Sequence, residues 1–214
     1  PGNADLVVQD GARRGRCRPE AGDEAVGRLA AGQWVLLQPL PESKLCGVPR
    51  LPDNHVPLPE VQAAHRSALL RGGSLGLTAA GVLATASYGR AGEGKTTMAA
   101  SLARDPRVQA HLDQVQWVTF GQGRTAMQAQ RALAEQVGLT GHAIERDQAR
   151  ARERGQRASA ALQALISSQL RDKRILLVSD DVWTSEQARA FSSVEAVGGL
   201  LLRLVTTRNQ KLAE

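Results

Sequence analysis

The sequence is poor in cysteine. Its 214 residues include only Cys17 and Cys46, and no Cys-x-x-Cys pattern occurs. Two thiols are too few for a disulfide scaffold, and their spacing does not match the usual zinc or redox motifs. A reducing compartment is the default expectation, and we expect the protein to be cytoplasmic.

Aromatic residues make up only 3% of the chain, and long apolar runs are missing although 42% of the residues are hydrophobic. No stretch approaches the roughly 18 uncharged apolar residues that a membrane-spanning helix requires. We therefore expect no membrane partner. The chain begins with Pro1 rather than Met, so we expect it to be an excerpt, from which targeting signals of the parent protein can be missing.

Acidic residues are outnumbered by basic ones, 21 to 27, which gives a net charge of +6. Such an excess can indicate a nucleic-acid partner. Much of the basic charge, however, lies in residues 146–174, where acidic residues such as Asp147 and Glu153 are interspersed. Mixed charge of this kind is typical of a solvated helix face. We therefore do not expect nucleic acid to be the primary partner.

Two regions differ in composition. Residues 1–53 are rich in Gly, Pro and Arg, and "QWVLLQPL" is their only strong apolar run, so we leave them as an unassigned segment and linker. Prolines in "VPRLPDNHVPLP" disfavour helix and predict an extended connection. Residues 54–214 are predicted to form one domain.

Helical and strand patterns alternate along this second region. Helices are predicted at residues 60–71, 95–103, 125–137, 158–170 and 185–191. Strands are predicted at residues 81–88, 114–120, 174–181 and 201–207. The alternation predicts an α/β fold, a P-loop NTPase three-layer sandwich in which helices cover both faces of a mainly parallel sheet.

One glycine-rich stretch, "GRAGEGKT" at residues 89–96, fits the phosphate-loop pattern G-x-x-x-x-G-K-[ST]. Glycines allow successive backbone N–H groups to face phosphate oxygens, and the next helix directs its positive end at the same anion. Lys95 would contact the β- and γ-phosphates, Thr96 would ligate Mg²⁺, and Thr97 would reach the α-phosphate. The predicted nucleotide-binding residues are Gly89, Gly92, Glu93, Gly94, Lys95, Thr96 and Thr97. The alternative is a mobile glycine turn that carries a solvated lysine.

Charged residues follow two of the predicted strands. Asp180 and Asp181 end "RILLVSDD", and ligands of open α/β sheets bind at the carboxyl ends of strands. We expect Asp180 to bind Mg²⁺ through water and Asp181 to polarise an attacking water. Arg208 follows "LLRLVTT" and could sense or stabilise the γ-phosphate. The alternatives are aspartates that cap the next helix and a solvated arginine that begins one.

These motifs, in this order, resemble the NB-ARC family, the nucleotide-binding domain of plant disease-resistance receptors and the animal apoptosome scaffold. "GRAGEGKTTMAASLA", "HLDQVQWVTF", "RILLVSDDVW" and "LVTTRNQKLAE" carry the resemblance, which covers residues 54–214. Ala91 replaces a preferred Gly, and Ser179 replaces the usual Leu or Asp. "NHVPLPEV" stands in place of the family's opening signature, and Val56 is our candidate for the adenine contact. The family's later segments would follow Glu214, so we expect an incomplete domain.

The resemblance implies a STAND-class signalling switch, as in defence responses. ADP would hold a closed state, ATP with Mg²⁺ would open it and permit self-association, and slow hydrolysis through Asp181 and Arg208 would reset it. One alternative is an AAA+ ATPase or a small-molecule kinase with residues 150–157 as a lid. Others are the nucleotide-binding module of a transcriptional regulator and a scaffold that binds no nucleotide. The intact Lys95, Thr96 and Asp180 argue against the last.

Overall fold

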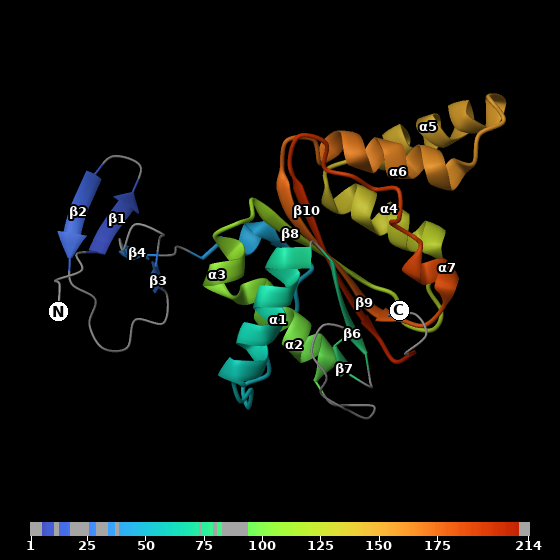
Figure 1. Ribbon diagram of the computed structural model, residues 1–214. Helices are drawn as coiled ribbons and strands as arrows, with labels where there is room; N and C mark the ends of the chain where they lie inside the picture. The colour runs from blue at the N-terminus through green and yellow to red at the C-terminus, as the bar shows by residue number, and fades with distance from the viewer. Residues whose placement is uncertain are drawn as a thin grey trace.

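The protein is described by a computed structural model (Figure 1). The described parts of the chain are residues 6–10, 13–17, 26–28, 34–36, 39–72, 74–78, 81–82 and 94–209. The first strands, in the sheet order β2-β1-β4-β3, are β1 (Leu6–Asp10), β2 (Arg13–Cys17), β3 (Val26–Arg28) and β4 (Trp34–Leu36). Strand β4 falls within the apolar run that the sequence analysis identified.

The larger sheet has the strand order β5-β8-β9-β10-β6-β7. Its strands are β5 (Leu45–Cys46), β6 (Ser74–Thr78), β7 (Gly81–Val82), β8 (Gln114–Thr119), β9 (Arg174–Val182) and β10 (Leu200–Thr207). Neighbouring strands pair in parallel, except that β7 is antiparallel to β6. The predicted mainly parallel α/β sheet is therefore confirmed.

Helices connect these strands near the predicted positions. After the short 3₁₀ turn η1 (Glu42–Lys44) they are α1 (Pro59–Gly72), α2 (Lys95–Arg104), α3 (Pro106–Gln109), α4 (Ala126–Gln136), α5 (Gly141–Glu153), α6 (Ala158–Gln169) and α7 (Ser185–Ala188). No helix in the described parts of the chain is long and apolar enough to cross a bilayer.

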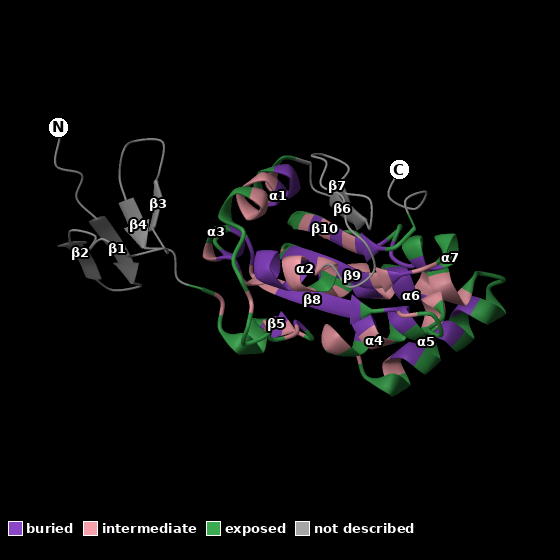
Figure 2. Cartoon of the chain, turned by 90° about the horizontal axis from the view of Figure 1, so that it is seen from below, coloured by how far each residue is buried: buried purple, intermediate pink, exposed green. Residues whose placement is uncertain are grey.

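The sheet separates two hydrophobic cores, as the period of two in a strand requires. In β9, Leu176 and Val178 belong to one core, with residues of α1, α2 and α3. Ile175 and Leu177 belong to the other, with residues of α4, α5 and α6. Figure 2 shows the buried central strands between these helices. A strand that is covered on both faces needs a continuous apolar run, which explains "ILLV" in β9.

The strand predicted at residues 81–88 is observed at Gly81–Val82, but it is not the parallel partner of β10. That partner is β6, with Leu204 opposite Leu75. Gly81 and Val82 instead form β7, which turns back on β6, and residues 83–88 lie outside the described residues. Strand β6 has a short alternation, with Leu75 and Leu77 between small or polar residues, and the sequence analysis did not use it.

The chain before α1 packs against the larger sheet. Strand β5 pairs with β8, and Leu45 and Val48 are buried in the first core. Arg104, at the end of α2, donates to the carbonyls of Pro49 and Val48 and pairs with Glu42 at 2.5 Å. These contacts attach residues 42–49 to the domain predicted for residues 54–214.

Helix α4 begins with a capping box. Thr125 accepts a hydrogen bond from the Gln128 backbone N–H at 3.2 Å, and the Gln128 side chain accepts one from the Thr125 N–H at 2.9 Å. Because the lost cap leaves helix-terminal donors without partners, Thr125→Ala should destabilise the fold by about 1 kcal/mol. The melting temperature should fall by about 2–4 °C. Thr125→Ser, which keeps the hydroxyl, is the control in a thermal unfolding experiment, and equal melting temperatures for Ala and Ser would contradict the capping role.

Candidate functional site

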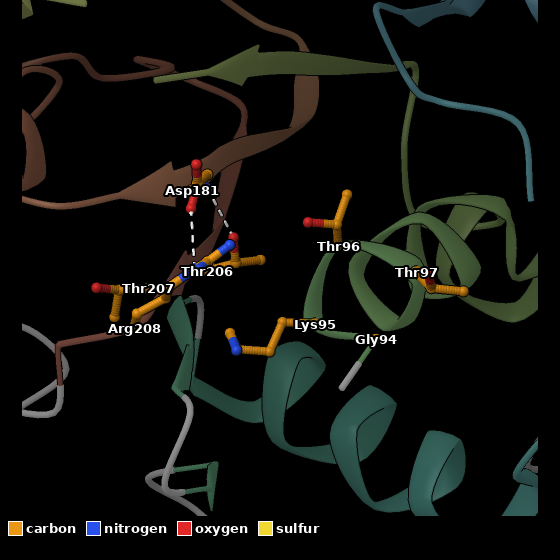
Figure 3. Close-up of a pocket in the computed structure, with 8 residues that line it drawn as sticks. All are labelled: Gly94, Lys95, Thr96, Thr97, Asp181, Thr206, Thr207 and Arg208. Atoms are coloured by element: carbon orange, nitrogen blue, oxygen red, sulfur yellow. Dashed lines mark hydrogen bonds and ion pairs between the residues drawn. The ribbon is translucent and has the colours of Figure 1, made fainter. Parts of the chain in front are cut away.

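The carboxyl ends of the parallel strands meet the start of α2 at one edge of the larger sheet. A cavity of about 180 Å³ lies there (Figure 3). It is lined by Gly94, Lys95, Thr96, Thr97, Asp181, Thr206, Thr207 and Arg208. The lining thus combines a helix N-terminus with the ends of β9 and β10, segments that are far apart in the sequence.

Helix α2 presents its N-terminus to this cavity. Gly94 is the N-cap residue with φ 79°, a left-handed conformation that favours glycine. Gly94 has no side chain that could cap the helix, and the first amide groups of a helix have no intrahelical acceptor. The helix dipole adds positive potential at the same point, and Lys95 adds a full charge. This end of the cavity is therefore suited to bind an anion.

Asp180 lies directly behind the cavity wall and is only 3% exposed. Three threonine hydroxyls from three elements surround it. Thr96 of α2 and Thr206 of β10 donate to its Oδ1 at 2.9 and 2.7 Å, and Thr119 of β8 lies 3.4 Å from its Oδ2. The carboxylate is therefore fixed between α2 and the sheet, and it reaches the cavity through these hydroxyls.

Asp181 takes a different position, in the cavity wall. Its φ of 54° is in the left-handed region, which few non-glycine residues adopt and Asp tolerates better than most. Its backbone N–H donates to Thr206 Oγ1 at 2.8 Å, and its carbonyl accepts from Gly121 N–H at 3.0 Å. Because the same Thr206 hydroxyl donates to Asp180, one side chain orients both acids.

Arg208 completes the cavity from the end of β10. Its Nε lies 3.7 Å from Asp181 Oδ1, and its guanidinium lies 5.1 Å from the centre of the Trp183 ring. Its side chain is 47% exposed. The cavity thus has two cationic side chains, Lys95 and Arg208, on opposing elements.

The structure brings most of the described candidates together. Gly94, Lys95, Thr96, Thr97, Asp181 and Arg208 line one cavity. Val56 does not line it and is 74% exposed in the segment before α1. Gly89, Gly92 and Glu93 lie outside the described residues. The roles predicted for these residues stay predictions.

Thr206 and Trp183 are the residues whose contacts the sequence analysis missed. Both stand inside motifs that were noticed, "LVTT" and "DDVW". A threonine pair at the end of a buried strand was the available signal, since hydroxyls there can satisfy neighbouring acids.

The oxygen ligands fit a small hard cation. Thr96 Oγ1 donates its proton to Asp180 Oδ1 at 2.9 Å, which leaves the lone pairs of the hydroxyl available to a cation such as Mg²⁺. Within the described residues, no group of three or more His, Cys, Asp or Glu side chains could hold a metal. Mg²⁺ in phosphate sites commonly uses one or two protein oxygens, water and phosphate, so the donor set is compatible with it.

A comparison with family models decides the identity. The NB-ARC domain model matches residues 75–214, which is more than half of the chain. The chain belongs to the NB-ARC family. This NB-ARC domain is a P-loop NTPase fold and a nucleotide-binding signalling module, and every residue that lines the cavity lies within the match. A comparison with curated proteins finds no match.

Proposed function

We propose that this NB-ARC domain is an ADP/ATP switch that binds the nucleotide phosphates in the cavity at the start of α2. The observation that carries the proposal is the meeting of three groups in or directly behind that cavity: the α2 N-terminus with Lys95, the Thr96–Asp180 pair, and Arg208. The amide groups and Lys95 bind phosphate oxygens. Mg²⁺, when bound, neutralises phosphate charge, with Thr96 as ligand and Asp180 behind it.

Arg208 is the residue through which the domain would distinguish ATP from ADP. It is attached to β10, whereas Lys95 and Thr96 are attached to α2. Since the γ-phosphate is the outermost group of ATP, we expect it to engage both elements when the other phosphates bind at α2. A ligand shifts a conformational equilibrium only through different affinities for two states. In the parent protein, ATP would favour an open state that self-associates and signals, as in a defence response.

Hydrolysis is expected to be slow. Asp181, our candidate to polarise water, faces the Arg208 guanidinium at 3.7 Å, so its carboxylate already interacts with a cation. Slow turnover suits a reset step better than a metabolic cycle. Residues 150–157, considered as a kinase lid, form the end of α5 and the turn to α6, and none of them lines the cavity.

Thermal unfolding with and without nucleotide tests the proposal. ADP with Mg²⁺, at 100 times its dissociation constant, should add about 2.7 kcal/mol to the free energy of unfolding if it binds only the folded state. Adenosine, which lacks phosphates, is the matched control ligand and should shift the transition much less. A cooperatively unfolding chain that ADP does not stabilise, or that adenosine stabilises equally, would refute phosphate binding in this cavity.

A further inference from the structure

Arg208 is contacted by two residues near the end of β9, Asp181 in the strand and Trp183 directly after it. Trp183 lies under the guanidinium at 5.1 Å, and Asp181 lies beside it at 3.7 Å (Figure 3 shows the Asp181 pair). The two contacts use different parts of the guanidinium. A carboxylate competes for the N–H donors, whereas an aromatic ring interacts with the face of the guanidinium and leaves its in-plane donors free.

The Trp183 platform is fixed to the domain. Its backbone N–H donates to Gln187 Oε1 at 2.7 Å, and the Gln187 amide donates to the carbonyls of Gly121 and Arg124. Gln187 is 4% exposed, so this anchor is buried. The loop after β8, the end of β9 and α7 are thereby joined immediately beside the ring.

Among the described residues, the indole of Trp183 makes no hydrogen bond. Its Nε1 is buried and has no hydrogen-bond partner among the residues that the structure describes. Buried tryptophans usually pair this group. The contact of the ring face with Arg208 is the polar interaction that the described residues offer the indole.

Asp181 restrains the orientation of the Arg208 guanidinium less than the Trp183 ring does. At 3.7 Å the pair is an ion pair beyond hydrogen-bond length, and the side chains are 47% and 32% exposed. A phosphate with two negative charges can take the guanidinium donors from one carboxylate while the ring contact persists.

We propose that Trp183 is a positioning residue: its ring presents the Arg208 donors to the terminal phosphate of a nucleoside triphosphate and so sets the preference for triphosphate over diphosphate. This inference rests on the proposed nucleotide switch. An exposed cation–π contact corresponds to about a two- to fivefold change in affinity. That change should appear in the ratio of the two affinities, because Arg208 would contact only the triphosphate.

Calorimetric titration of the 214-residue chain with ADP and with a non-hydrolysable ATP analogue, both with Mg²⁺, tests the proposal. Trp183→Leu removes the ring and keeps apolar bulk, and it should lower the triphosphate preference about two- to fivefold. Trp183→Phe keeps an aromatic face and should retain most of the preference. In an Arg208→Ala background, Trp183→Leu should leave the ratio unchanged, because the residue acts through the arginine.

The outcomes separate the two proposals. Equal losses for both nucleotides in Trp183→Leu, an unchanged ratio, or the same effect without Arg208 would overturn the positioning role and leave nucleotide binding in place. If the wild-type chain binds neither nucleotide, the switch itself is refuted, and the role of Trp183 is refuted with it.

Discussion

Lys95→Ala should lower the affinity for ADP at least tenfold, a loss of about 1.4 kcal/mol. Lys95 is the first residue of α2 and lines the cavity, so its charge adds to the positive end of the helix. The amide groups of α2 remain in the variant, and residual binding is therefore expected. Calorimetric titration with ADP and Mg²⁺ measures the loss directly.

The structure also predicts that this variant folds. Within the described parts of the chain, no residue forms a hydrogen bond or ion pair with the Lys95 side chain, so its removal breaks no such contact there. Unfolding without nucleotide should be nearly unchanged. Lys44→Ala is the matched control, since Lys44 is exposed and does not line the cavity. Wild-type affinity in Lys95→Ala would show that the cavity at α2 is not the phosphate site.

Much of the fold could be predicted because its elements have strong periodic signals. The run of buried residues in β9 and the glycine before α2 fix a strand and a helix start with little ambiguity. Strand β6 was harder. Ser74–Thr78 and residues 81–88 are both short strand-like stretches, and pairing with β10 decides between them. Such pairing is a tertiary effect that local sequence does not encode.

The residues of the site also fall into two groups, those that the sequence could predict and those that it could not. The spacing of a phosphate loop brings Gly94, Lys95 and Thr96 together because one turn and one helix contain them all. The contacts of Thr206 and Trp183 depend instead on how β9 and β10 align. The register shifts between Val205 and Thr207, beside the left-handed Asp181. No sequence motif specifies such an irregularity, so those contacts could be found only in the folded chain.

Asp180→Asn should remove most of the Mg²⁺ dependence of ADP binding while sparing the fold. The asparagine oxygen can still accept from Thr96 and Thr206, whereas alanine would leave both hydroxyls without that acceptor. Asp180→Asn removes only the negative charge of the carboxylate that lies behind Thr96, the expected Mg²⁺ ligand. Loss of such a supporting group lowers metal affinity about tenfold to a hundredfold. The enhancement of ADP affinity by Mg²⁺ over chelator should therefore shrink, and ADP affinity in chelator should change much less.

Asp181→Asn is the matched control for this charge effect. Asparagine tolerates the left-handed backbone found at this position, and Asp181 pairs with Arg208 rather than with Thr96. The control should keep its Mg²⁺ dependence and lose turnover instead. Equal Mg²⁺ enhancement in wild type and Asp180→Asn would move the metal role to another residue, with Asp181 the first to test because it already lines the cavity. The two variants together therefore assign the neighbouring acids to separate tasks, one for the cation and one for the water.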